Sequence, residues 1–125
     1  MSDSPLLIED HDGVRLITIH RPDKLNALNS ATLDALHAAF DDAAESADVR
    51  AIVLTGAGPK AFVAGADIAE MADLRPVEGR DFALRGQRMM RRVELMPKPV
   101  IAMINGFALA AGWNWPCAAT CASPP

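Results

Sequence analysis

Two segments of this 125-residue chain place small residues directly after an apolar, β-prone run. The first is residues 60–68, Lys-Ala-Phe-Val-Ala-Gly-Ala-Asp-Ile, and the second is residues 98–109, Lys-Pro-Val-Ile-Ala-Met-Ile-Asn-Gly-Phe-Ala-Leu. Glycine and alanine let backbone N–H groups approach a ligand closely, and two such groups aimed at one point form an oxyanion hole. The pattern therefore indicates stabilisation of negative charge on a carbonyl oxygen.

The elements that must position these segments begin with a hairpin and a helix. Residues 6–9 and 14–20 are β-prone runs separated by Asp12-Gly13, a dipeptide typical of a tight hairpin turn. A helix is predicted to follow, with Ser30 as its N-cap. Its apolar positions recur at three- and four-residue spacing, at Leu33, Leu36, Phe40 and Ala44.

The second half of the chain continues the alternation of strand and helix. Residues 50–55 are predicted to be a strand buried on both faces of a mostly parallel sheet. A short helix is expected over 67–72 and a longer one over 79–96, followed by an apolar strand over 100–104. The order β-β-α-β-α-β predicts one α/β domain with repeated crossovers.

Charge and composition limit the kinds of partner and the location that we expect for this chain. The net charge is −4 with no basic stripe, no apolar run approaches the roughly 20 residues that span a bilayer, and no basic, apolar leader begins the chain. We therefore expect no nucleic-acid or membrane partner and a cytoplasmic location. No metal site is predicted, because the residues that bind metals lack ligand spacing: His11, His20, His37, Cys117 and Cys121.

The two small-residue segments, together with Lys24-Leu25-Asn26-Ala27-Leu28-Asn29, resemble motifs of the enoyl-CoA hydratase (crotonase) family in the same order. The resemblance extends over residues 6–109 and implies a crotonase-like (ClpP/crotonase) ββα spiral, truncated here. It also implies a lyase that adds water to 2-enoyl-CoA thioesters in fatty-acid β-oxidation. Coenzyme A is then part of the substrate, so no separate cofactor is expected.

The same resemblance assigns roles to individual residues. The oxyanion-hole amides would be those of Ala66 and Ala111. The residues implied to bind substrate are Leu25, Ala27, Ala64, Ala66, Asp67 and Ile68, with Ala64 near the adenine and Ile68 near the acyl chain. Asp67 and Glu70 lie beside the expected hole, but acids in a first helical turn more often stabilise the helix N-terminus, and we favour that role for both.

The resemblance breaks off after Leu109. Hydratases of the family use two glutamates for proton transfer; the first position is occupied by Asn114 and the second falls after residue 125. The chain as written is therefore expected to lack hydratase turnover. The region with which family members form trimers or hexamers is likewise expected to be missing.

A frameshift accounts for the change of sequence. Family members continue with a run like Gly-Gly-Gly-Leu-Glu-Leu-Ala, where residues 110–116 are Ala-Ala-Gly-Trp-Asn-Trp-Pro. Codons for Trp113 to Pro116, joined one base out of frame, read Glu-Leu-Ala. We hypothesise a one-base deletion near codons 109 and 110, which makes residues 1–109 the N-terminal part of a crotonase-like domain and residues 110–125 an aberrant tail. No well-defined geometry is expected after Leu109.

Other functions stay open at this stage. The residues that divide hydratases from isomerases, dehalogenases and thioester hydrolases of the family lie after Leu109, and an inactive fragment is a further alternative. The glycine-containing segment 56–61 suggests a nicotinamide-dependent oxidoreductase as another interpretation. It is disfavoured because Pro59 interrupts that segment and no helix follows at once.

Overall fold

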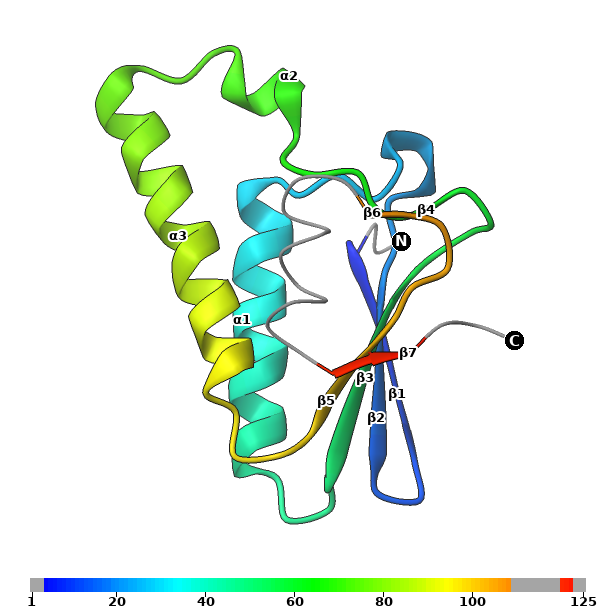
Figure 1. Ribbon diagram of the computed structural model, residues 1–125. Coiled ribbons are helices and arrows are strands. Elements are labelled where there is room, and N and C mark those ends of the chain that lie inside the picture. Colours follow the sequence, from blue (N-terminus) through cyan, green and yellow to red (C-terminus); the bar gives the residue numbers. More distant parts are fainter. Residues whose placement is uncertain (1–3, 109–119, 123–125) are drawn as a thin grey trace.

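The computed structural model describes residues 4–108 and 120–122, so the predictions for Leu109, Ala111 and Asn114 lie outside the described residues (Figure 1). The elements in chain order are β1 (Leu6–His11), β2 (Val14–Ile19), the 3-10 helix η1 (Pro22–Lys24), α1 (Ser30–Glu45), β3 (Ala51–Gly56), β4 (Ala61–Val63), α2 (Ile68–Met71), α3 (Pro76–Glu94), β5 (Val100–Met103), β6 (Phe107–Ala108) and β7 (Thr120–Ala122).

Five strands form the main sheet in the order β1-β2-β3-β5-β7, and β4 pairs with β6 in a second, two-stranded sheet. β1 is antiparallel to β2, and the remaining pairs are parallel. Helices α1 and α3 lie on the same side of the main sheet (Figure 1). Two successive ββα units, β1-β2-α1 and β3-β4-α3, confirm the predicted α/β architecture with crossovers.

The predicted hairpin is confirmed by its turn. Asp12 and Gly13 both have positive φ, 50° and 85°, which matches the twist of the two flanking strands. The prediction for β3 is only half right. Ile52 and Leu54 are fully buried toward the helices, whereas Val53 on the other face is only partly buried, because the described helices cover a single face of the sheet.

Helix α1 begins one residue earlier than predicted, because a different residue caps it. The Asn29 side chain accepts hydrogen bonds from the backbone N (2.9 Å) and Oγ1 (2.6 Å) of Thr32, so Asn29 is the N-cap and Ser30 is the first helical residue. The residues that α1 buries are Thr32, Leu33, Leu36, Ala39, Phe40 and Ala43. Ala44, predicted on this face, is only partly buried because Ala43 occupies the core position.

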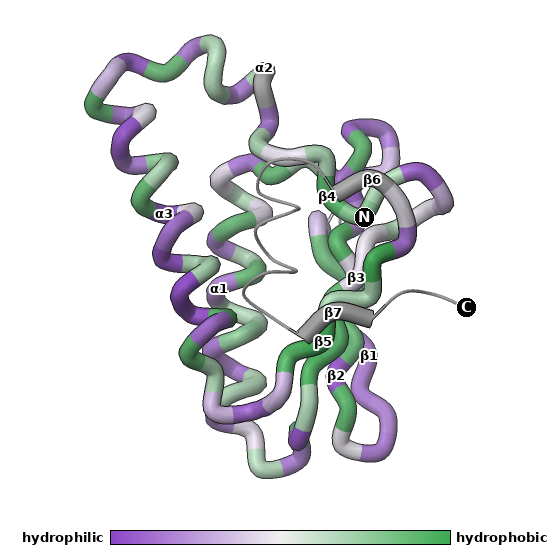
Figure 2. Tube along the Cα trace, in the orientation of Figure 1, coloured by the Kyte–Doolittle hydropathy of each residue, from purple (hydrophilic) through white to green (hydrophobic). Residues whose placement is uncertain are grey.

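Helix α3 begins earlier than predicted, at Pro76, where proline at the first helical position sacrifices no hydrogen bond. Only Met89 and Val93 are fully buried, and Phe82 and Met90 pack partly against the core. Much of the rest of the helix is hydrophilic, and its N-terminal part extends past the sheet together with α2 (Figures 1 and 2).

Three short strands were not predicted: β4, β6 and β7. β7 pairs in parallel with β5, at Ile101↔Thr120 and Ala102↔Cys121. β7 lies within residues 110–125, and its assignment to an aberrant tail stays a prediction.

Candidate functional site

The two motif segments lie side by side. β4 belongs to the first segment and β6 to the second, and they pair in parallel at Ala61↔Phe107 and Val63↔Ala108. Gly106 is required by this approach, because a Cβ there would lie 2.9 Å from the backbone N of Ala61 and closer still to the carbonyl of Lys60. The predicted juxtaposition of the segments is confirmed.

The 24–29 segment is joined to the first motif by backbone hydrogen bonds. The amide of Ala64 donates to Leu25 O (3.2 Å), that of Leu28 donates to Gly65 O (2.8 Å), and that of Asp67 donates to Leu28 O (2.7 Å). These bonds alternate along both segments, as in a short parallel ladder. The backbone of residues 64–67 is therefore held against residues 25–28.

Ala66 contributes no amide to this ladder. Ala64 and Asp67 use their amides in it, whereas the amides of Gly65 and Ala66 have no acceptor among the described residues. Gly65 turns the chain just before it with φ 106°, a conformation in which a side chain would be strained. A partly buried amide with no partner in the described structure is available to an oxygen atom of a ligand.

Ala66 also lines an apolar cavity of about 270 Å³ between α1 and α3. The cavity is lined almost entirely by hydrophobic residues: Leu28, Leu33, Ala66, Met71, Phe82, Ala83, Gly86, Gln87 and Met90. Apolar walls with one convergent polar group are typical of sites that bind small molecules. The role predicted for the Ile68 side chain stays a prediction, because the structure describes only the backbone of that residue.

Arg21 joins residues 24–29 to the first motif segment through a hydrogen bond and an ion pair. Arg21 Nη2 donates to Asp67 Oδ2 (3.0 Å), and Arg21 Nη1 donates to Ala27 O (2.5 Å). The Arg21 and Asp67 side chains are 16% and 13% exposed. Arg21 therefore connects the segment carrying Ala27 to the residue that follows Ala66.

Asp67 caps α2, as expected. Its Oδ1 accepts from the amides of Ala69 (3.0 Å) and Glu70 (3.4 Å). Burial, the largest single influence, acts to raise the pKa of Asp67, but the hydrogen bonds from Arg21 and these amides together hold that pKa below its usual value. The carboxylate is thus kept ionised and engaged, which favours a structural role over that of a base.

Glu70 caps a different helix from the one predicted. Its carboxylate accepts from the backbone N of Ser30 (3.0 Å) and from Ser30 Oγ, so it stabilises the N-terminus of α1 and not that of α2. The two acids beside Ala66 therefore tie α2 to the loop of Arg21 and to α1.

A comparison with known proteins identifies the family. The family model described as enoyl-CoA hydratase/isomerase matches residues 9–121. The chain belongs to the enoyl-CoA hydratase/isomerase family. The match extends past Leu109 into the residues that we assigned to an aberrant tail, and the frameshift hypothesis stays a prediction.

Relatives in this family include a short-chain-enoyl-CoA hydratase of Clostridium acetobutylicum, 48% identical over 107 residues, and a crotonyl-CoA hydratase of Syntrophomonas wolfei, 45% identical over 111 residues. The alignments cover 86% of this chain and 41% of each relative. The crystal structure of an enoyl-CoA hydratase from Bacillus anthracis superposes with a TM-score of 0.92 at 34% identity, over 95% of this chain and 47% of that one. The chain therefore has the crotonase fold and spans less than half the length of these relatives.

In this member of the enoyl-CoA hydratase/isomerase family, the buried side chain of Asn26 joins three backbone segments near the site. The sequence did not predict this role. The Asn26 side chain is fully buried; Oδ1 accepts from the amide of Arg21 (2.9 Å), and Nδ2 donates to Ala57 O (3.0 Å) and Ala61 O (2.8 Å). Leu25 and Asn26 have φ of 53° and 58°, which is strained for leucine and tolerated by asparagine. The signal in the sequence was an asparagine inside a motif otherwise rich in apolar residues.

A second asparagine, Asn105, connects the second motif segment by hydrogen bonds to residues 56–61, which Asn26 also contacts. Asn105 Oδ1 accepts from the amide of Gly56 (3.1 Å), and its Nδ2 donates to Gly58 O (2.8 Å) and Ala61 O (3.0 Å). The carbonyl of Ala61 thus accepts from both Asn26 and Asn105. This shared acceptor fixes the start of β4 relative to both neighbouring segments.

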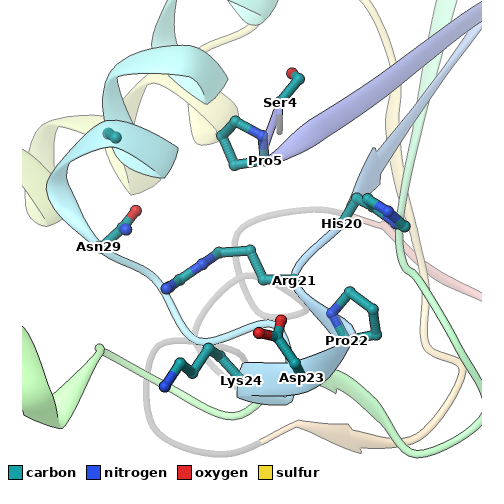
Figure 3. A pocket seen from close by; sticks show the side chains of 9 residues that line it. Ser4, Pro5, His20, Arg21, Pro22, Asp23, Lys24 and Asn29 are labelled. Atoms are coloured by element: carbon teal, nitrogen blue, oxygen red, sulfur yellow. The ribbon is translucent and has the colours of Figure 1, made fainter. Parts of the chain in front are cut away.

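Two surface hollows flank the loop that carries Leu25. The larger, about 590 Å³, lies where η1 approaches the start of α1, and Figure 3 shows Arg21 extending across it toward Asn29. The smaller, about 250 Å³, is lined by Leu25 and Lys60 among others. Leu25 therefore lies on an open surface hollow, in keeping with its predicted place along a ligand.

Residues 4–108 and 120–122 contain neither a candidate metal cluster nor a candidate membrane-spanning helix. No group of three or more histidine, cysteine, aspartate or glutamate residues there could hold a metal ion. None of the described helices combines the length and the apolar character needed to cross a bilayer.

Proposed function

We propose that this chain binds the acyl thioester of coenzyme A, with the thioester oxygen accepting a hydrogen bond from the Ala66 N–H. The observation that carries the proposal is the position of Ala66 at the wall of an apolar cavity, where its amide has no acceptor among the described residues. The acyl chain would occupy that cavity. Ala111 would supply the second amide, and the coenzyme A moiety would lie along Leu25, Ala27 and Ala64.

The reaction proposed for the lineage is hydration of a 2-enoyl-CoA, because relatives at 45–48% identity are named for hydratases. When water adds to an unsaturated thioester, negative charge develops on the carbonyl oxygen. A fixed N–H aimed at that oxygen lowers the barrier, and loss of one such donor typically costs about 100- to 1,000-fold in rate. Isomerisation and thioester hydrolysis use the same stabilisation and are the alternatives.

For the 125-residue chain we propose binding without turnover. The position of the first glutamate of the family's hydratases is occupied by Asn114, and an amide side chain cannot act as a general base at neutral pH. A spectrophotometric assay with crotonyl-CoA tests this: no hydration is expected, and turnover on the order of 1 s⁻¹ or faster would contradict it.

A binding experiment tests the role of Ala66. Butyryl-CoA is saturated and cannot be hydrated, so its affinity can be measured by isothermal titration against that of free coenzyme A. Ala66→Pro removes the N–H without removing any hydrogen bond of the described residues, and Ala66→Gly keeps the N–H as a matched control. We expect Ala66→Pro to weaken butyryl-CoA binding about fivefold or more relative to Ala66→Gly, since a hydrogen bond contributes about 1 kcal/mol or more.

An Ala66→Pro variant that binds butyryl-CoA as tightly as the Ala66→Gly variant would refute the assignment of this amide. The cytoplasmic location is also a proposal, as is the expectation that the purified chain does not form a trimer. Size-exclusion chromatography of the purified chain tests the second, because a trimer would contradict it.

A further inference from the structure

Helix α3 contains two glycines whose backbone and surroundings do not require glycine. Gly79 and Gly86 both lie within the helix, and neither has a positive φ. A Cβ built on either one has no heavy atom of the described residues within 4 Å. Glycine is the least favourable helix residue after proline, so a different reason is needed for its presence.

Only one of the two glycines faces the apolar cavity. Gly86 lines it, and Gly79 does not. Phe82 and Met90, four residues before and after Gly86, also line it, so the three lie on one stripe of the helix. The missing side chain at position 86 leaves a notch between two large ones.

The cavity wall opposite this stripe includes Leu28 and Leu33, and Ala66 lines the same cavity. A thioester bound at Ala66 would send its acyl chain along these apolar walls. The notch at Gly86 is space that the chain can fill without moving Phe82 or Met90.

We propose that Gly86 is a specificity-determining residue that admits the acyl chain between Phe82 and Met90 and thereby sets the acyl length that the site accepts. The inference rests on the proposed function, since it assumes a thioester at Ala66. Each methylene buried adds about fourfold to affinity. A side chain at position 86 should therefore remove the affinity of the methylenes that it displaces and leave coenzyme A binding unchanged.

The test measures the affinities of the full 125-residue chain for free coenzyme A, butyryl-CoA, hexanoyl-CoA and octanoyl-CoA by isothermal titration. Gly86→Leu is the variant, and Gly79→Leu is the control on the same helix, with equal space around its Cβ and no contact with the cavity. We expect Gly86→Leu to lower the ratio of hexanoyl-CoA to coenzyme A affinity on the order of tenfold, as two displaced methylenes imply. Gly79→Leu should leave that ratio unchanged.

Each outcome decides between the two claims. If the wild-type chain binds acyl-CoA no more tightly than coenzyme A, the proposed function fails and the inference fails with it. If the wild type prefers acyl-CoA and Gly86→Leu keeps the same ratio, the inference alone is overturned.

Circular dichroism and thermal unfolding provide the second measurement. Both leucine variants should keep the wild-type helix content and melt no lower, because leucine favours a helix over glycine. If Gly86→Leu unfolds while Gly79→Leu does not, position 86 is packed and not open, which also overturns the inference.

Discussion

Replacing Arg21 with methionine tests whether the partly buried ion pair with Asp67 stabilises the loop that carries Ala66. Methionine keeps an unbranched apolar stem but removes the donors to Asp67 Oδ2 (3.0 Å) and Ala27 O (2.5 Å). The Asp67 carboxylate, 13% exposed, would then lose its cation. Breaking a buried pair costs about 3–5 kcal/mol, and an exposed pair contributes about 0–1. These side chains are closer to the buried case, so we expect the free energy of unfolding to fall by about 2–3 kcal/mol.

The chain offers a matched control for this substitution. Arg75 donates to Glu78 at 2.8 Å, but the two side chains are 84% and 46% exposed. Arg75→Met removes an ion pair of similar length from solvent, and its effect should be smaller than that of Arg21→Met because water screens the exposed pair. Urea unfolding followed by far-UV circular dichroism measures both variants under the same two-state analysis.

A double-mutant cycle isolates the pair itself. Arg21→Met combined with Asp67→Asn should cost about 1 kcal/mol or more less than the sum of the single changes, because the second change removes the charge that the first leaves unpaired. If Arg21→Met costs no more than Arg75→Met, or if the two changes at the pair are additive, burial does not strengthen this contact and the reasoning is refuted.

Three further predictions concern the same region. Asn26→Asp places a carboxylate oxygen against two carbonyl oxygens that Asn26 now bonds, and it should lower the free energy of unfolding in urea by about 2–4 kcal/mol; a loss below about 1 would contradict the role of this side chain. The pKa of Asp67 is held below its usual value of 3.8, so its stabilising contribution is present above that pH and is lost as pH falls through the folded-state pKa. Wild-type stability should therefore decline more steeply with acid below about pH 4 than that of Asp67→Asn, and equal slopes would rule this out. Gly106→Ala forces a Cβ to 2.9 Å from Ala61 N and should cost about 1–3 kcal/mol, whereas Gly79→Ala should add about 0.5–1, both read from thermal unfolding; equal effects would contradict the packing argument.

The sequence predicted the main elements because their signals are local. Asp12-Gly13 requires positive φ, and the apolar runs that became β3 and β5 need no distant partner to be recognised. β4 and β6, by contrast, have three and two residues. Strands this short carry no periodicity, and they form only because two distant segments pair.

The cap of α1 shows a different limit. Asn29 and Ser30 are adjacent, and both are good N-cap residues. The choice is decided by Glu70, forty residues away, which takes the amide and hydroxyl of Ser30 and leaves Asn29 to cap. A local rule cannot include that contact.

The sequence indicated the two motif segments of the candidate site, but not the side chains that hold these segments in place. Resemblance implied that the amide of Ala66 lies beside a ligand, which stays a prediction, and the structure pairs the two motif segments. Arg21 and Asn26 were missed because their roles are long-range contacts, such as that between Arg21 and Asp67, 46 residues apart. Such contacts leave no pattern in the neighbouring sequence.

The carbonyl oxygen of Ala61 accepts from Asn26 Nδ2 at 2.8 Å and from Asn105 Nδ2 at 3.0 Å. One main-chain atom is therefore the common reference point for two loops that come from opposite ends of the described chain. Neither loop can shift away from this atom without giving up a buried or partly buried hydrogen bond. The spacing of the loops is thus built into the peptide backbone, and it survives any change of side chain at position 61 that leaves that backbone in place.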